Sequence, residues 1–237
     1  MDNFQQLVAH NLGITLSNAQ TDMFALFEEI LLKWNKKYNL TAITNPDEIR
    51  IKHFYDSLTC FSMIPVNETI MLIDIGTGAG FPGIPLIIIN PLIQLTLVES
   101  IAKKADFCQI ALNELGFKDT HVVTSRAETI GQEPIHREHY DWAVARAVAP
   151  LSVLVEYSLP LVRVGGSVLA QKGIELDTEI NEAKKAISLL GGNVVSTLPI
   201  SLPNNMGKRT LIQIGKKKPT PAIYPRRPGT PKKSPLI

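Results

Sequence analysis

The sequence contains little cysteine: Cys60 and Cys108 are the two in the chain, and they lie far apart without C-x-x-C spacing. This usage argues against a disulfide framework and against a cysteine zinc site. It favours two small buried thiols in a reducing cytosol. The histidines also lack the spacing of metal ligands, so each is predicted to be a structural or surface residue and no metal is expected. These histidines are His10, His53, His121, His136 and His139.

Long hydrophobic runs are missing as well. The apolar run Ile84–Ile89 is far shorter than a membrane span. The first residues carry Asp2 and show no basic-then-apolar signal pattern. The sequence therefore predicts a cytoplasmic protein that does not contact a membrane.

Acidic residues are absent from the C-terminal part of the chain. The last one is Glu182, and 183–237 contains 11 Lys and Arg residues with no acid. The preceding 182 residues hold 13 basic and 22 acidic residues, although the whole chain has a net charge of only +2. This asymmetry indicates a polyanionic partner. A disordered, solubilising tail would show the same composition, and charge alone does not separate the two.

The chain has 237 residues, 45% of them hydrophobic, which suffices for one large domain with an extension. Alternating apolar strands and amphipathic helices predict an α/β fold with a mostly parallel sheet, helices on both faces and a final antiparallel hairpin. The predicted strands are Ile70–Ile75, Gln94–Val98, His121–Thr124, Asp141–Ala145, Ser167–Gln171, Asn193–Thr197 and Arg209–Ile214.

Helices are predicted between and before these strands. One covers Ser17–Tyr38, and a second starts at the cap Asn45 and continues to Phe61. Others run from a Ser100 cap to Leu115 and over Leu151–Val162, and the acids Glu175, Asp177 and Glu179 open the last one before Gly191.

Three segments follow from this pattern. Residues 1–66 are predicted to form an N-terminal helical cap and residues 67–215 the α/β domain. Residues 216–237 hold six prolines and seven basic residues, which predicts an extended arm without regular structure. Its basic pairs and Tyr224 suit contacts with phosphates and one stacking surface.

A glycine-rich turn follows the first strand, in the sequence IMLIDIGTGAGFPGIP (70–85). Glycines allow close approach of a ligand to the backbone, and the following helix start offers free N–H groups. The dinucleotide pattern G-x-G-x-x-G fits only from Gly78, with Pro82 placed where pyrophosphate needs N–H groups. The alternative frame, with Asp74 kept at the strand end, suits a ligand without phosphate such as S-adenosylmethionine, because its sulfonium and amino groups favour a nearby carboxylate.

Further candidate residues follow the ends of later strands, where α/β folds bind their ligands. Glu99 is placed to accept hydrogen bonds from ribose hydroxyls, or to interact with the helix that follows. A backbone N–H at Ala127–Glu128 is placed to meet an adenine edge, and Arg146 and Lys172 follow the fourth and fifth strands. The sequence contains neither a P-loop nor a G-x-S-x-G elbow.

Together, several motifs resemble the RsmG (GidB) family, in collinear order from about Leu31 to the C-terminus. They are NLTAIT (39–44), KHFYDSL (52–58), LIDIGTGAGFPGIPL (72–86), SRAE (125–128), ARAVAPL (145–151), QKG (171–173) and YPRRPGTPKKSPL (224–236). The family consists of bacterial S-adenosylmethionine-dependent 16S rRNA (guanine-N7) methyltransferases with the Rossmann-like class I methyltransferase fold. The resemblance therefore implies this activity, this cofactor and 16S rRNA or the small ribosomal subunit as partner.

The resemblance also implies roles for individual residues. Gly76 and Phe81 would line the methionine and adenosine site, and Ala127 and Glu128 would meet the adenine. Arg146 would complete the cofactor pocket. Asp74 and Glu99 are predicted as further cofactor residues from their positions at the ends of the first two strands, not from the resemblance. The family often has Leu where this chain has Gln171, a departure next to Lys172.

Three other interpretations explain parts of the same sequence. A dinucleotide-dependent oxidoreductase keeps the Gly78 frame with Glu99 on the ribose. A methyltransferase of small molecules leaves the basic arm unexplained. An RNA-binding ribosome-assembly factor without activity keeps the arm and tolerates loss of the glycines.

Overall fold

Seven strands form one sheet in the computed structural model, which describes residues 1–173 and 176–237. Their order across the sheet is β3-β2-β1-β4-β5-β7-β6, and the first five are parallel while β7 is antiparallel to both of its neighbours. The strands are β1 (Ile70–Ile75), β2 (Ile93–Glu99), β3 (His121–Thr124), β4 (Tyr140–Arg146), β5 (Val162–Lys172), β6 (Gly192–Ser201) and β7 (Lys208–Lys216). The predicted parallel sheet and its terminal antiparallel hairpin are confirmed.

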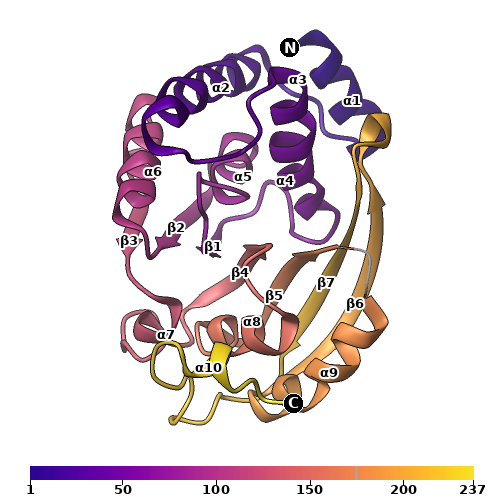
Figure 1. Cartoon of the computed structure of the whole chain (residues 1–237). Helices are drawn as coiled ribbons and strands as arrows, with labels where there is room; N and C mark the ends of the chain where they lie inside the picture. The colour runs from indigo at the N-terminus through magenta and orange to yellow at the C-terminus, as the bar shows by residue number, and fades with distance from the viewer. Residues whose placement is uncertain (174–175) are drawn as a thin grey trace.

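Helices cover both faces of this sheet (Figure 1). One face carries α1 (Asp2–Leu12), α2 (Asn18–Tyr38), α3 (Pro46–Ile49), α4 (Asp56–Leu58), α5 (Gly83–Ile89) and α6 (Ala102–Glu114). The other face carries α7 (Ala127–Ile130), α8 (Leu151–Ser158), α9 (Leu176–Leu189) and α10 (Thr230–Lys233). Two hydrophobic cores result, because alternate strand residues point to opposite faces: Leu72 packs toward the N-terminal helices, whereas Ile73 and Ile75 pack toward α8.

The N-terminal helices share one core with the sheet rather than forming a separate unit. Phe24 and Phe27 of α2 pack against Phe54, and the Phe27 ring also lies 5.4 Å from that of Phe81. These aromatic contacts fix the helical layer against the end of the glycine turn, where Phe81 lies.

The helix predicted from Asn45 exists, and the Asn45 side chain caps it by accepting hydrogen bonds from two backbone N–H groups. It is not uniform, because η1 (Arg50–Tyr55) is a π-helical turn and η2 (Thr59–Ser62) a 3₁₀ turn. π-Helical turns widen a helix and often occur at functional sites.

Two details of the helix predictions are wrong. Ser100 does not cap α6; Glu99 accepts a hydrogen bond from the N–H of Ile101 at 2.8 Å instead. Helix α8 ends at Ser158, and β5 begins at Val162, upstream of the Gly165–Gly166 pair. A bulge in the β4–β5 pairing takes the two glycines into the strand. Helix α9 ends as expected, whereas Glu175 lies outside the described residues.

The C-terminal arm, residues 216–237, folds back over α7 and α8, as the yellow segment in Figure 1 shows. The prediction of no regular structure is wrong for Thr230–Lys233, because Pro231 at the start of α10 has a backbone angle that a helix accepts. Lys216 roots the arm: its ammonium group is buried, donates to the carbonyls of Leu159 and Val162, and pairs with Glu138 at 3.1 Å.

A second buried ion pair fixes the middle of the arm. Arg226 donates from Nε and Nη2 to the two carboxylate oxygens of Glu156, which is fully buried on α8. Its neighbour Arg227 is exposed. The two adjacent arginines thus differ completely in environment, which their positions in the sequence do not reveal.

We expect Arg226→Ala to lower the free energy of unfolding by about 3 kcal/mol, because it leaves the buried Glu156 carboxylate without its charged partner. Arg227→Ala is the matched control and is expected to change stability by less than about 0.5 kcal/mol. Urea unfolding of both variants measures the difference, and equal stabilities would contradict this assignment.

Candidate functional site

The candidate site lies where the parallel strands β1, β2, β4 and β5 end. In open α/β sheets, ligands bind at these carboxyl ends. A larger hollow of about 750 Å³ lies instead near the strand starts, bordered by residues such as Met71, Gln94 and Tyr140. Because this larger hollow lies at the amino ends of the strands, the smaller hollows at the carboxyl ends are the candidate active site.

Asp74, on β1, holds the glycine turn that follows the strand. Its Oδ2 accepts hydrogen bonds from the Thr77 hydroxyl at 2.7 Å and from the Gly83 N–H at 2.8 Å. Gly76 and Gly78 have φ angles of 66° and 62°, in the left-handed region that favours glycine. Burial raises the pKa of Asp74 to about 6, against the lowering effect of these two hydrogen bonds. Asp74 therefore shapes the turn from within the core.

Glu99 ties the same turn to the end of β2. One carboxylate oxygen accepts from the Gly78 N–H at 3.1 Å, and the other accepts from the Ile101 N–H at the start of α6. The side chain thus interacts with the helix start, one of its two predicted roles. Neither of these hydrogen bonds involves a ligand, so the role of Glu99 in binding ribose hydroxyls stays a prediction.

A narrow crevice of about 100 Å³ lies between the ends of β1 and β2 and the start of α7. We call it the β1–β2 crevice. Its lining combines Gly76 and apolar side chains with the predicted pair after β3; it consists of Ile75, Gly76, Val98, Ser100, Ser125, Arg126, Ala127, Glu128, Val148 and Tyr157. Three of the predicted site residues, Gly76, Ala127 and Glu128, are therefore brought together here.

Glu128 makes a contact that the sequence did not predict. Its carboxylate accepts a hydrogen bond from the N–H of Gly229 at 2.9 Å, in the C-terminal arm. The residue is 3% exposed. The arm therefore reaches one wall of the crevice.

A second, wider hollow of about 410 Å³ lies beyond β4. We call it the β4–β5 pocket. Basic, acidic and amide side chains from four parts of the chain line it: Ile43, Lys52, His53, Asp56, Arg146, Ala147, Gln171, Lys172, Gly173 and Arg209. Ala147, directly after Arg146, has a φ angle of 54°, and strained backbone of this kind clusters at functional sites.

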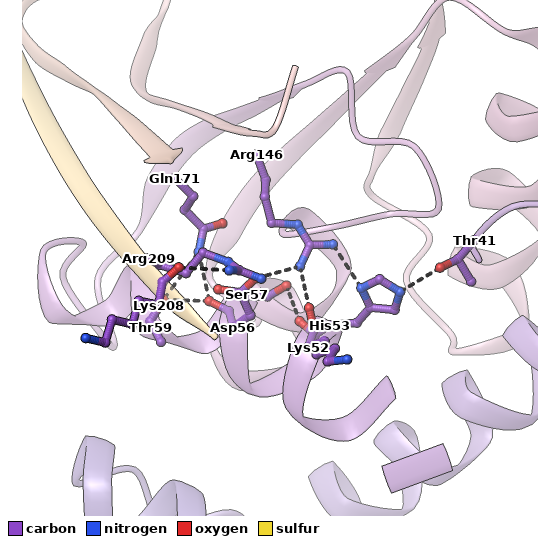
Figure 2. A network of polar contacts seen from close by, with 10 residues as sticks. All are labelled: Thr41, Lys52, His53, Asp56, Ser57, Thr59, Arg146, Gln171, Lys208 and Arg209. Atoms are coloured by element: carbon purple, nitrogen blue, oxygen red, sulfur yellow. Dashed lines mark hydrogen bonds and ion pairs between the residues drawn. The ribbon is translucent and has the colours of Figure 1, made fainter. Parts of the chain in front are cut away.

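Arg146 is the centre of a polar network in this pocket (Figure 2). Its Nη1 donates to the Lys52 carbonyl at 3.1 Å and lies 3.3 Å from Asp56 Oδ2, and its Nη2 lies 3.3 Å from His53 Nδ1. Its guanidinium carbon lies 5.1 Å from the centre of the Phe81 ring. The structure thus brings Arg146 and Phe81 together, and their predicted roles in cofactor binding stay predictions.

His53 is a neutral member of this network. Burial, followed by the nearby positive charge of Arg146, lowers the pKa of His53 to about 3. With Nδ1 accepting from Arg146, Nε2 carries the proton and donates to the Thr41 hydroxyl at 2.9 Å. The imidazole also stacks on Phe81 with ring centres 4.6 Å apart.

Asp56 neutralises two arginines from distant parts of the chain. Its Oδ2 lies 3.3 Å from Arg146 Nη1 on β4 and 3.2 Å from Arg209 Nε on β7. The carboxylate is 1% exposed. Asp56, His53 and Arg209 were not predicted as site residues. The motif KHFYDSL (52–58) contains His53 and Asp56, whereas none of the motifs contains Arg209.

The absence of a metal site stays a prediction. Among residues 1–173 and 176–237, no group of three or more His, Cys, Asp or Glu side chains is arranged to hold a metal ion. In the same described part of the chain, no helix is both long and apolar enough to cross a membrane.

The chain is similar in fold to solved structures, several of which are described as methyltransferases. The chain superimposes on an O-methyltransferase from Bacillus cereus in complex with SAH with a TM-score of 0.62 at 18% identity, covering 91% of this chain and 97% of that one. For the YcgJ protein from Bacillus subtilis the TM-score is 0.54 at 14% identity, covering 70% of this chain and 100% of that one. The sheet order and the glycine turn define the class I fold of S-adenosylmethionine-dependent methyltransferases.

Sequence comparisons give the family within this class. Residues 20–207 match the family model GidB, described as rRNA small subunit methyltransferase G. Proteins named "Ribosomal RNA small subunit methyltransferase G" are 49% identical in Alkaliphilus metalliredigens (95% of this chain, 94% of theirs) and 45% identical in Staphylococcus aureus strain Newman (98% and 96%). This chain belongs to the rRNA small subunit methyltransferase G family and is a methyltransferase.

The lowered pKa of His53 makes stability depend on pH. Folding lowers this pKa from 6.5 to about 3, so the unfolded chain binds the proton more readily and stability falls as the pH falls from 6.5 toward 3. We expect His53→Gln to remove this contribution, at most about 1.4 kcal/mol per pH unit. Urea unfolding of wild type and variant at pH 7, 6 and 5 measures it.

Asp74 contributes with the opposite sign between pH 3.8 and about 6, because its pKa is raised in the folded state. This contribution is common to both proteins, so the difference between their pH slopes reports His53. Parallel slopes for the two proteins would show that His53 titrates normally.

Proposed function

We propose that this protein transfers the methyl group of S-adenosylmethionine to N7 of one guanine in 16S rRNA. The observation that carries the proposal is the pair of adjoining hollows at the strand ends, in a chain that belongs to the small-subunit rRNA methyltransferase family. One hollow has the features of a cofactor site, and the other is lined by basic side chains. Because the RNA substrate is made in the cytoplasm, the proposal also places the protein there.

The β1–β2 crevice has the features that S-adenosylmethionine requires. A side chain at Gly76 would place its Cβ 2.9 Å from Val148, so only glycine leaves room at this wall. Glu99 stands at the end of β2, where a carboxylate accepts from ribose hydroxyls. The start of α7 at Ala127 offers a backbone N–H for the adenine edge. Phe81 and Arg146, whose side chains lie against each other, are proposed to complete the cofactor site. Asp74 would act by holding the turn.

Guanine N7 needs no general base, because it has an in-plane lone pair and no proton. When bound, S-adenosylmethionine supplies a methyl group on a positive sulfur. The protein's task is therefore to position the base and to exclude water. The network agrees, since His53 is held neutral with both ring nitrogens in hydrogen bonds. Asp74 and Glu128 are the nearby carboxylates, and Phe81 the nearby ring, to favour the positive charge that the purine gains.

Basic residues around the β4–β5 pocket give the surface for a phosphate backbone. Lys52, Lys172 and Arg209 line it, and Lys208 is exposed beside it. In the arm, the exposed basic residues are Lys217, Lys218, Arg227, Lys232 and Lys233, whereas Arg226 is engaged with Glu156. N7 lies in the major groove, which is too narrow in A-form RNA, so the target guanine is expected in a loop, a distorted segment or an assembled particle.

The direct test uses methyl-labelled S-adenosylmethionine and small ribosomal subunits from a strain that lacks this activity. We expect the label in 7-methylguanosine at one position of 16S rRNA, located by nuclease digestion and mass spectrometry. Naked 16S rRNA serves as the second substrate and shows whether the assembled particle is required. Cofactor binding without label in any RNA would instead favour a small-molecule methyltransferase or an assembly factor.

The glycine turn gives a second test. We expect Gly76→Ala to weaken S-adenosylmethionine binding at least about 10-fold, because the new Cβ meets Val148 in a residue with positive φ. Arg146→Ala is expected to lower turnover strongly while the fold survives. Calorimetric titration and single-turnover methylation measure both effects. Gly116→Ala, which also has positive φ but open space around it, is the control for backbone strain alone. Near wild-type methylation by the Gly76 and Arg146 variants would reject this site.

A further inference from the structure

Two buried oxygen atoms at the β4–β5 pocket have no hydrogen-bond partner among residues 1–173 and 176–237. They are Oδ1 of Asp56 and Oε1 of Gln171. The residues are 1% and 2% exposed, and both line the pocket. A buried acceptor without a donor is costly, because it has given up its hydrogen bonds to water.

The remaining polar atoms of these two side chains are already engaged. Asp56 Oδ2 pairs with Arg146 and Arg209, and Gln171 Nε2 donates to the Asp56 carbonyl at 2.8 Å. This fixes both side chains and sets the Gln171 amide so that its oxygen is the free atom. The pocket therefore presents two fixed hydrogen-bond acceptors, and neither of them receives a hydrogen bond from the described residues.

Guanine supplies two adjacent donors. Its Watson–Crick edge carries N1–H and the N2 amino group, whereas adenine offers an acceptor at N1 and no donor at C2. Proteins read unstacked RNA bases through hydrogen bonds to this edge. We propose that the β4–β5 pocket binds the acceptor guanine and that Asp56 Oδ1 and Gln171 Oε1 accept hydrogen bonds from N1–H and N2–H. This inference rests on the proposed function and assigns its base specificity to named atoms.

The order of the strands in the sheet sets the orientation of the base that this recognition requires. N7 and the Watson–Crick edge lie on different sides of the purine, so the reading groups must stand across the pocket from the cofactor. The β1–β2 crevice lies at the ends of β1 and β2, and β4 separates β1 from β5. Gln171 pairs in register with Arg146 and stands at the end of β5, on the far side of Arg146 from the crevice. A base between them presents N7 toward the crevice and N1 toward Gln171.

Entry of the base requires one side chain to move, because both oxygens are closed to solvent. Arg209 is the group that moves: its side chain is 29% exposed, against 14% for Arg146, and both hold the same carboxylate oxygen. An RNA phosphate can replace Asp56 as its partner, so Arg209 keeps a negative neighbour when it leaves. Arg146 remains on Asp56 and keeps that charge paired.

The test compares guanine with inosine, which lacks the N2 amino group and keeps N7, O6 and N1–H. The substrate is 16S rRNA, free or reconstituted into small subunits, with the target guanine replaced by inosine through splinted ligation. For the wild-type protein we expect kcat/KM to be roughly 10- to 100-fold lower for inosine, because one buried acceptor stays unpaired. A difference below about 3-fold would overturn the proposal without any variant.

Asp56→Asn and Gln171→Met then assign the effect to the two side chains. At least one of them is expected to bring the guanine-to-inosine ratio close to 1. The ratio compares two substrates on the same protein with the same cofactor, so partial unfolding or weaker cofactor binding does not change it. Asp47→Asn, an exposed carboxylate on the same helical segment, is the matched control and keeps the wild-type ratio.

The outcomes distinguish the proposed function from the proposed recognition of the base. If the wild-type protein methylates neither substrate although it binds S-adenosylmethionine, the proposed function fails. If it methylates guanine and both variants keep the wild-type ratio, the proposed function stands and the reading by Asp56 and Gln171 is wrong. A change confined to the cofactor Kd in Asp56→Asn also contradicts the reading of the base and assigns Asp56 to the cofactor instead.

Discussion

The buried carboxylate of Asp56 is the constraint on which the site depends. A charge that is 1% exposed is tolerated only with charged partners and hydrogen bonds, and Asp56 takes both partners, Arg146 and Arg209, from distant strands. These contacts join the N-terminal helical layer to β4 and β7. Arg146 in turn contacts His53 and lies over the Phe81 ring, so one carboxylate holds together the polar network of the β4–β5 pocket.

The same physical rule fixes the C-terminal arm. Lys216, at the start of the arm, and Glu156, on α8, are both buried charges. Lys216 pairs with Glu138, and Glu156 pairs with Arg226 of the arm. The N–H of Gly229 adds a contact to Glu128 at the crevice. A proline-rich segment with little structure of its own is thus held by charge pairing. Part of its basic character serves folding, and the remaining exposed basic residues are available to a phosphate backbone.

Much of the fold was predictable because its signals are local. Apolar alternation located the seven strands to within a few residues, except that β5 and β6 extend further, and the Asn45 cap is determined by adjacent backbone groups. Cap assignment failed at Ser100 because the helix begins one residue later, with Ile101 at the cap position, and Glu99 accepts the hydrogen bond from the Ile101 N–H. The π-helical turn at Arg50–Tyr55 was not predictable, since periodicity does not distinguish it from an ordinary helix.

The sequence by itself determined the α/β order, the glycine turn and the family, because these depend on residues close together or on motifs in fixed order. The resemblance also implied a shared site for Phe81 and Arg146, which stays a prediction although their side chains are in contact. Only the tertiary structure decided that Asp56 and Arg209 share a charge contact, that Arg226 pairs with a buried carboxylate while Arg227 is exposed, and that two acceptors at the pocket have no donor among the described residues. Burial and pairing of charges depend on which distant segments meet, and no local pattern records this.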